Sequence, residues 1–275
     1  MKPFAALNVG SYEQTLKIYT ITKNNGIREV DWIRNRLDLG GTFATGKLSH
    51  EVMDELCAVL RNFVSIMEGY RVDDYRACAT SAIRETKNTA IVLDQIMQRT
   101  GVKLDVLSNS EQRFLDYKSI ASRGGFEKII EKGTLVLDIG GGSTEFSVSR
   151  EGELLAAESL RVGCVRLADL FFRDFPDAVP KAKFREVQDY VRDKSVMPFK
   201  RLLAKKPREL IASSGTAGAI ASLALSMRTA EQTSVSSDTT VITIDEVRAV
   251  VDKICSSTAA ERAALPGMNQ KRVGV

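Results

Sequence analysis

The first third of the chain arranges its apolar and polar positions with two different periods. Residues 4–11, 15–22 and 27–37 form three strand-like runs that are separated by turn residues. Asn24-Asn25-Gly26, between the last two stretches, predicts a hairpin turn. Residues 48–67 instead repeat apolar side chains every three to four positions, which predicts an amphipathic helix. A sheet followed by a helix is therefore the expected start of the fold.

Short strand patterns and helical patterns then follow one another. We expect strands at residues 75–80 and 103–107 and a helix at residues 89–99. A further helix should begin at Ser108, because Ser108 and Glu111 have the spacing of a capping box. That helix should run to about residue 122, where Arg123-Gly124-Gly125 ends it.

The same order of elements recurs in the second half. Residues 134–150, TLVLDIGGGSTEFSVSR, combine an apolar run, three glycines and renewed alternation, which predicts another hairpin. Asn8 to Ser11 and Asp138 to Gly141 then occupy equivalent positions in two copies of one plan. The remaining elements of the second copy are strands at 153–162 and 209–213 and helices at 165–174, 181–204, 217–225 and 245–256, the last capped by Thr243 or Asp245.

Each copy reads as a three-stranded antiparallel meander followed by alternating helices and strands, so the fold class is α/β. We expect two lobes, residues 1–123 and residues 124–275, each with a mixed sheet and flanking helices. Lobes that place their glycine-rich hairpins face to face would bracket a ligand in the cleft between them.

The hairpin at residues 138–145 carries the candidate chemistry. Its three glycines are expected to permit positive φ and to leave backbone N–H groups uncovered by side chains. Such N–H groups, with two neighbouring hydroxyls, can form a concavity that binds phosphate. The flanking carboxylates, Asp138 and Glu145, suit a hard cation such as Mg²⁺. The alternative is a plain hairpin in which the glycines serve only the turn.

Composition narrows the classes of function. The chain has 275 residues, of which 44% are hydrophobic and 27% charged, as in ordinary globular proteins. No apolar stretch approaches the roughly 18 residues of a membrane span. Four scattered cysteines and the single His50 argue against a zinc site, a disulfide framework or a Ser-His-Asp triad, and they fit a reduced cytoplasm. The net charge of +4, without a basic block, does not indicate nucleic-acid binding.

Several motifs resemble one known family. The string VLDIGGGSTEF at residues 136–146 resembles the signature of the exopolyphosphatase and guanosine-pentaphosphate phosphohydrolase family, which has two actin-like (ribonuclease H-like) lobes. The other segments that are similar to family motifs, in the same order, are ALNVGSYEQTLKIY, RNRLDLGGTFATGKLS, ACATSAIRETKN, LSNSEQRFLDY, SLRVGCVRLAD and ASSGTAGAIASLA. Together they span nearly the whole chain.

The resemblance implies roles for individual residues. Asp138 and Glu145 would hold Mg²⁺ or another divalent cation. Arg84 would pair with phosphate oxygens through its bidentate guanidinium, although a solvated helix-start residue is the alternative. Phosphate would also be held by Gly10 and Ser11 of the first lobe and by Gly140, Gly141, Gly142, Ser143, Thr144, Gly215 and Thr216 of the second.

Two departures from the family pattern concern the chemistry. Asn8 stands where the first loop normally has Asp, so that loop loses a negative charge. Gln112 stands where the family has its water-activating Glu, and an amide cannot accept a proton from water. Glu111 is its neighbour, but adjacent helix positions point about 100° apart. The catalytic position is therefore assigned to Glu111 and Gln112 together, with binding better supported than hydrolysis.

Three functions follow from the resemblance. The first is a cytoplasmic, Mg-dependent phosphohydrolase that removes terminal phosphate from polyphosphate or the 5′-phosphate of pppGpp, a stringent-response nucleotide. The second is a weakened regulator that binds polyphosphate or guanosine penta- or tetraphosphate. The third is an actin-like ATPase or sugar kinase, although no adenine or sugar pocket is marked. A homodimer is left open, and no nucleic-acid or membrane partner is expected. The family resemblance would continue past PGMNQKRVGV into a last strand and helix, so a truncated or trimmed chain is expected, with a naturally short protein as the alternative.

Overall fold

The computed structural model describes residues 2–21, 26–122, 131–172, 179–228, 240–270 and 273. Contacts divide the chain into two compact units, Met1–Phe114 and Leu115–Val275. The turn expected at Asn24 and Asn25, the helix end expected at residues 123–125 and the lobe boundary expected after residue 123 lie outside the described residues, so they stay predictions. None of the described helices is both long and apolar enough to cross a membrane.

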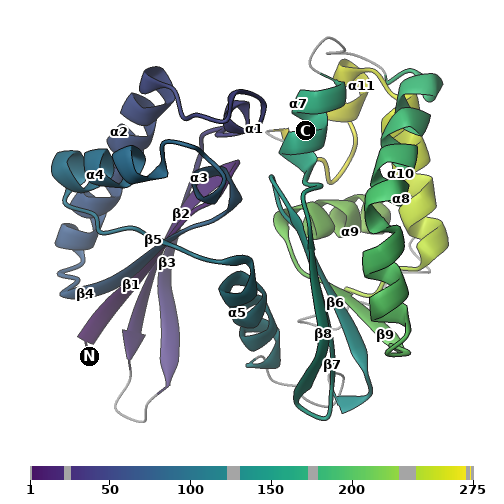
Figure 1. Cartoon of the computed structure of the whole chain (residues 1–275), viewed down its shortest axis with the longest axis horizontal. Coiled ribbons are helices and arrows are strands. Elements are labelled where there is room, and N and C mark those ends of the chain that lie inside the picture. Colours follow the sequence, from purple (N-terminus) through teal and green to yellow (C-terminus); the bar gives the residue numbers. More distant parts are fainter. Residues whose placement is uncertain are drawn as a thin grey trace. The chain divides into compact units, whose positions relative to one another are not determined.

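The first unit is built on a five-stranded sheet with the order β3-β2-β1-β4-β5 (Figure 1). β1 runs antiparallel to β2 and parallel to β4, as the expected meander and crossover require. The elements of this part of the chain are β1 (Lys2–Val9), β2 (Glu13–Ile21), β3 (Ile27–Arg36), α1 (Gly41–Thr45), α2 (His50–Gly69), β4 (Asp74–Ala79), α3 (Ser81–Arg84), α4 (Thr89–Thr100), β5 (Asp105–Val106) and α5 (Asn109–Ala121).

Helices α2 and α4 supply the core of this unit together with β1 and β2. The apolar stripe of α2, which includes Leu56, Leu60 and Phe63, is fully buried in one cluster with Leu16 and Ile18 of β2. Burial of such side chains is the main favourable term in folding. His50 begins α2 and is exposed, as expected from the sequence.

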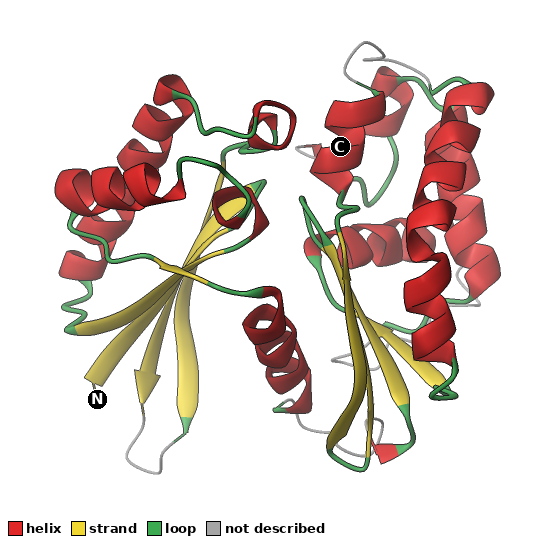
Figure 2. Ribbon diagram, viewed as in Figure 1, coloured by secondary structure: helices red, strands yellow, loops and turns green. Residues whose placement is uncertain are grey.

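The second unit repeats the plan with the sheet order β8-β7-β6-β9, in which β6 pairs antiparallel with β7 and parallel with β9. Figure 2 shows these strands as one sheet with helices beside it. The predicted repeat of one topology is therefore confirmed. The elements here are β6 (Thr134–Ile139), β7 (Thr144–Arg150), β8 (Glu153–Leu160), α7 (Cys164–Phe171), α8 (Lys181–Leu203), β9 (Glu209–Ala212), α9 (Gly215–Met227), α10 (Ile244–Ser256) and α11 (Ala259–Ala263).

Hydrophobic clusters distinct from the core of the first unit pack against this second sheet. Phe146 of β7 packs edge-on against Phe199 of α8, with ring centroids 5.2 Å apart. Ile120, near the end of α5, packs against Val136 of β6. Because β7 is buried along nearly its whole length, its polar residues must find partners inside the protein. This requirement applies directly to Glu145.

Candidate active site

The turn between β6 and β7 places the two predicted metal ligands side by side. Asp138 and Glu145 are directly opposite each other in the antiparallel pair, so both side chains project from the same face of the hairpin. Gly140 N–H donates to the carbonyl of Ser143 at 2.9 Å and closes the turn. We call residues Gly140–Ser143 the glycine loop.

The reason for glycine in this loop differs from the sequence expectation. Left-handed φ occurs at other described glycines, such as Gly133 and Gly152, but not at the three glycines of the loop, so that expectation is wrong. Close packing explains Gly140 instead, and it also requires glycine at the neighbouring Gly163. A Cβ at Gly140 would lie 3.0 Å from the Ser143 carbonyl oxygen, and a Cβ at Gly163 would lie 2.4 Å from the carbonyl of Gly141.

Helix α7 holds the carbonyl groups of the glycine loop. Cys164 N–H donates to the Gly140 carbonyl and Arg166 N–H to the Gly141 carbonyl, both at 3.0 Å. The Nε of Arg166 donates to the Gly142 carbonyl at 2.7 Å. In a planar trans peptide the N–H points opposite to the C=O, so the N–H groups of the next residues point away from α7. In the described part of the chain, the N–H groups of Gly141, Gly142 and Ser143 have no hydrogen-bond acceptor.

These free donors make the glycine loop a concavity suited to an anion. Ser143 and Thr144 are buried beside it. The Ser143 hydroxyl donates to Glu145 at 3.0 Å, and the Thr144 hydroxyl donates to the Val162 carbonyl. Both hydroxyls are therefore engaged in supporting the loop, whereas the backbone N–H groups remain available to an anion.

Three carboxylates influence one another beside the loop. Glu145 is 3% exposed, and its Oε1 accepts hydrogen bonds from the hydroxyls of Ser143 and Ser159. Burial, together with the charges of Asp116 and Glu145, raises the pKa of Asp138 to about 8. Burial and the charge of Glu145 raise the pKa of Asp116 to about 7. Such crowding of like charges is relieved when a cation is bound.

Asp116 is the residue of this site that the sequence reasoning missed. Asp116 lies on α5, one turn after Gln112. The four-residue spacing places both residues on one helix face, and this spacing could have indicated Asp116 from the sequence. Its Oδ2 is buried and has no hydrogen-bond partner among the described residues. Those residues contain no group of three or more His, Cys, Asp or Glu side chains arranged to hold a metal ion.

The start of α9 reaches the same edge of the second sheet. β9 pairs parallel with β6, and Ser213 N–H donates to the Leu137 carbonyl at 2.7 Å, one residue before Asp138. Gly215 and Thr216 form the first turn of α9, which the Ser214 hydroxyl caps. The Thr216 hydroxyl lies 3.8 Å from the Cys164 Sγ at the start of α7. The structure thus brings together the predicted residues of the second copy.

The first unit has its own small turn with the predicted phosphate-binding residues. Gly10 N–H donates to the Glu13 carbonyl at 3.0 Å, and a Cβ at Gly10 would lie 2.7 Å from that oxygen. The Ser11 hydroxyl lies 2.9 Å from the hydroxyl of Ser81, the first residue of α3. Asn8 is exposed on β1. This turn is fixed by its own hydrogen bonds and carries no carboxylate at position 8.

Arg84 and Gln112 contact each other within the first unit. Arg84 ends α3, and its Nη1 donates to the Leu107 carbonyl at 2.7 Å and to Gln112 Oε1 at 3.3 Å. Glu111 instead closes the predicted capping box, because its carboxylate accepts from Ser108 N–H at 2.8 Å. The hydrogen bonds from Ser108 hold the pKa of Glu111 below its ordinary value. Glu111 is therefore engaged at the helix cap.

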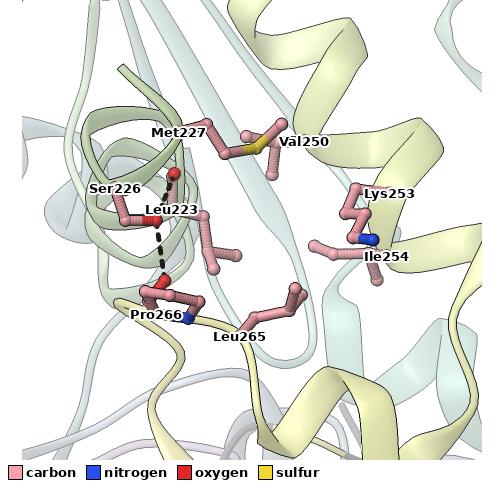
Figure 3. A pocket seen from close by; sticks show the side chains of 8 residues that line it. All are labelled: Leu223, Ser226, Met227, Val250, Lys253, Ile254, Leu265 and Pro266. Atoms are coloured by element: carbon pink, nitrogen blue, oxygen red, sulfur yellow. Dashed lines mark hydrogen bonds between the residues drawn. The ribbon is translucent and has the colours of Figure 1, made fainter. Parts of the chain in front are cut away.

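Two cavities near the C-terminal helices contain none of the predicted site residues. The smaller, about 80 Å³, lies between α9, α10 and the turn at Pro266, and its walls are mostly apolar (Figure 3). The larger, about 340 Å³, includes Arg228 and Glu246, which form an ion pair at 2.7 Å. The chemistry of the glycine loop is not reproduced at either cavity.

Comparison with known proteins identifies the family of the chain. Residues 24–275 match the model of the Ppx/GppA phosphatase family. The chain belongs to the Ppx/GppA phosphatase family. The matched range includes the glycine loop, Asp138 and Glu145, whereas Gly10 and Ser11 precede it.

Individual Ppx/GppA relatives differ in how much they share with the chain. Exopolyphosphatase 1 of Mycobacterium leprae is 30% identical over 84% of this chain and 66% of its own length. The guanosine-5′-triphosphate,3′-diphosphate pyrophosphatase of Aliivibrio fischeri is 28% identical over 62% of this chain and 34% of its own length. The chain therefore spans less than two thirds of each of these relatives.

Solved structures of similar proteins confirm the fold. The exopolyphosphatase of Cytophaga hutchinsonii superimposes with a TM-score of 0.86 at 22% identity, covering 99% of this chain and 86% of that one. The Ppx/GppA protein of Aquifex aeolicus gives a TM-score of 0.72 at 22% identity over 100% of this chain and 86% of that one. The predicted α/β class, with two units that are each a mixed sheet with flanking helices, is confirmed.

Proposed function

We propose that this protein is a phosphohydrolase that removes the terminal phosphate of inorganic polyphosphate or the 5′-phosphate of pppGpp. One observation carries the proposal. Three free N–H groups of the glycine loop lie at the end of the hairpin that pairs Asp138 with Glu145. Free donors beside two carboxylates suit a substrate whose charged end is a phosphate group. The names of the relatives favour the same class of substrate.

The two paired carboxylates fit a divalent cation of the kind that phosphate enzymes use. Mg²⁺ is bound through one or two carboxylates, with water and phosphate oxygens completing its coordination, so a third protein ligand is not required. Asp138 and Glu145 would hold Mg²⁺ or another divalent cation, which when bound neutralises charge on the phosphate oxygens.

The glycine loop would supply electrostatic stabilisation in the reaction. Water attacks the terminal phosphorus, the bond from that phosphorus to the bridging oxygen breaks, and a proton leaves the water for the leaving oxygen or the solvent. The N–H groups of Gly141, Gly142 and Ser143 donate to the phosphoryl oxygens as their charge redistributes. Gly215 and Thr216 at the start of α9, and Gly10, Ser11 and Arg84 in the first unit, are further phosphate contacts in this proposal.

Phosphate release tests the proposal directly. Purified protein is incubated with Mg²⁺ and either long-chain polyphosphate or pppGpp, and inorganic phosphate is measured over time. We expect release that depends on the cation and falls to background in Asp138→Ala. The same background rate in the parent protein and in Asp138→Ala, with both substrates, would show that the protein is not such a hydrolase.

A second candidate function is a cytoplasmic regulator that binds polyphosphate or guanosine penta- or tetraphosphate with little turnover. Two observations favour it: Gln112 is an amide that accepts a hydrogen bond from Arg84, and Glu111 is engaged at the cap of α5. An amide cannot act as general base, and loss of a base costs about 10² to 10⁴ in rate. If the protein is such a regulator, calorimetry should detect binding of polyphosphate or the guanosine nucleotide without phosphate release. Gln112→Glu should then raise turnover. If calorimetry detects binding of neither polyphosphate nor the guanosine nucleotide, this candidate is eliminated.

A further inference from the structure

We infer that Arg166 is a positioning residue for phosphate binding, which acts on the glycine loop from behind without contacting the phosphate itself. This inference rests on the proposed phosphate-binding role of the glycine loop. Arg166 is 9% exposed, and it provides two of the three hydrogen bonds that α7 donates to the carbonyls of the loop, one from its backbone and one from its side chain.

The orientation of the loop depends on these hydrogen bonds. The Gly142 carbonyl accepts from the Arg166 Nε at 2.7 Å, a distance typical of a charge-assisted hydrogen bond. The same peptide unit carries the Ser143 N–H, which therefore points to the opposite side. Without the guanidinium this peptide could rotate, and the Ser143 N–H would leave the set of three donors.

Polarisation of the loop peptides adds to the effect of their orientation. A carbonyl that accepts a hydrogen bond makes the N–H of its own peptide a stronger donor, and the effect accumulates along connected hydrogen bonds. The three loop carbonyls accept from the first turn of α7 and from the Arg166 cation, so all three free N–H groups belong to polarised peptides. The positive end of the helix and the positive guanidinium both favour a negative ligand on the opposite side of the loop.

The close contact at Gly163 supports this arrangement independently. A Cβ there would lie 2.4 Å from the Gly141 carbonyl carbon and oxygen and 2.6 Å from the Gly142 carbonyl carbon. The backbone at the start of α7 therefore touches the loop backbone directly. This contact brings the Arg166 side chain within reach of the Gly142 carbonyl.

The test separates the charge of Arg166 from its hydrogen bond. Arg166→Gln retains an N–H donor without the charge, Arg166→Lys retains the charge, and Arg166→Ala removes both. Arg192→Ala is the matched control, because Arg192 is an exposed arginine of α8 in a surface ion pair with Asp189. Binding of tripolyphosphate is measured by calorimetry in chelator, so that the loop is assayed without a metal, and circular dichroism monitors folding.

We expect Arg166→Ala and Arg166→Gln to weaken tripolyphosphate binding about 10- to 100-fold. Arg166→Lys should bind with intermediate affinity, and Arg192→Ala should bind within twofold of the parent. If the parent releases phosphate, the Arg166 variants should raise KM more than they lower kcat, because the loop holds phosphate before and during the reaction.

The outcomes distinguish this inference from the proposed function. Folded Arg166→Ala and Arg166→Gln that bind tripolyphosphate within twofold of the parent would overturn the inference, as would a parent that does not bind it. If Arg166→Ala does not fold, Arg166→Gln and Arg166→Lys decide in the same way. A parent that binds tripolyphosphate but releases no phosphate refutes hydrolysis while the inference is still decided by the affinities.

Discussion

At the scale of single residues, the site depends on a glycine whose lack of a Cβ lets the backbone before α7 touch the backbone of the glycine loop. Gly163 lies against Gly141 and Gly142 at distances that leave no room for a methyl group. Interiors are packed closely enough that one added carbon forces neighbouring atoms to move. The backbone of the glycine loop is the neighbour that must move here, so a change at Gly163 acts on the phosphate donors.

Gly163→Ala should therefore weaken phosphate binding and destabilise the fold by about 1 to 3 kcal/mol. Gly218→Ala is the matched control, because a Cβ at Gly218 in α9 meets nothing within 4 Å. The control should bind tripolyphosphate normally and be as stable as the parent or slightly more stable. Calorimetry and urea unfolding measure both effects. Equal affinity in the two variants would show that the contact at Gly163 does not shape the loop.

Asp138 should make stability depend on pH in the absence of divalent cations. Its pKa rises from 3.8 to about 8 on folding, so between about pH 4 and pH 8 the folded protein binds more protons than the unfolded chain. Stability is then greatest below about pH 4 and is lost as the pH rises through about 8. Asp138→Asn should raise the free energy of unfolding at pH 8 by about 1 to 3 kcal/mol, allowing for screening by solvent.

Urea unfolding in chelator at pH 5 and pH 8 measures this effect. Asp189→Asn is the control, since Asp189 is an exposed residue of α8. Parent and control should lose stability between the two pH values, whereas Asp138→Asn should lose less. An equal loss of stability in all three proteins would show that Asp138 does not cause the pH dependence.

At the scale of elements, α5 has a capping carboxylate at its start and a second carboxylate, Asp116, near Asp138. Ser108 and Glu111 form a reciprocal capping box at its start. Tyr117 and Ile120 at its other end pack near Val136 of β6, and Asp116 is in this second half of the helix. The helix therefore contributes a carboxylate to the site one turn later than the family pattern predicts.

Glu111→Ala should consequently have a small effect. Loss of one half of a capping box lowers the free energy of unfolding by about 1 kcal/mol or less. Turnover, where the parent shows it, should remain within twofold, and steady-state phosphate release measures it. A hundredfold loss of turnover in a folded Glu111→Ala protein would instead identify Glu111 as the base.

At the scale of the whole molecule, each of the two copies of one topology has buried hydrophobic clusters of its own. The largest cluster includes Phe63 and Leu60 of the first unit, and another includes Phe146 and Leu202 of the second. A ligand that binds only the folded chain raises its stability, so ligand binding should be detectable in an unfolding experiment.

Mg²⁺ with tripolyphosphate should raise the free energy of unfolding. At a ligand concentration of about 100 times Kd, one site that exists only in the folded state contributes about 2.7 kcal/mol. Thermal unfolding of the parent and of Asp138→Ala, each with and without the two ligands together, measures the effect. The increase should be smaller in Asp138→Ala, which keeps the loop N–H groups but loses a proposed cation ligand. An equal increase in both proteins would show that Asp138 does not contribute to binding.

The sequence by itself determined the elements and the composition of the loop. Alternation and helical spacing depend on neighbouring residues, so the longer strands and helices, both glycine-rich turns and the Ser108 cap were predicted correctly. The short helices α1, α3 and α11 were not predicted, and β5 comprises only two residues rather than the five expected. Such short segments are stabilised by tertiary contacts more than by local pattern.

Only the tertiary structure decided how the loop is held and which groups surround it. The hydrogen bond from Arg166 to Gly142 joins residues 24 positions apart, and that from Arg84 to Gln112 joins residues 28 apart. Local periodicity contains no information about such pairs, because they form only when distant segments pack. The glycine loop was therefore recognised from its residues, whereas the direction of its N–H groups and the proximity of Asp116 followed from packing.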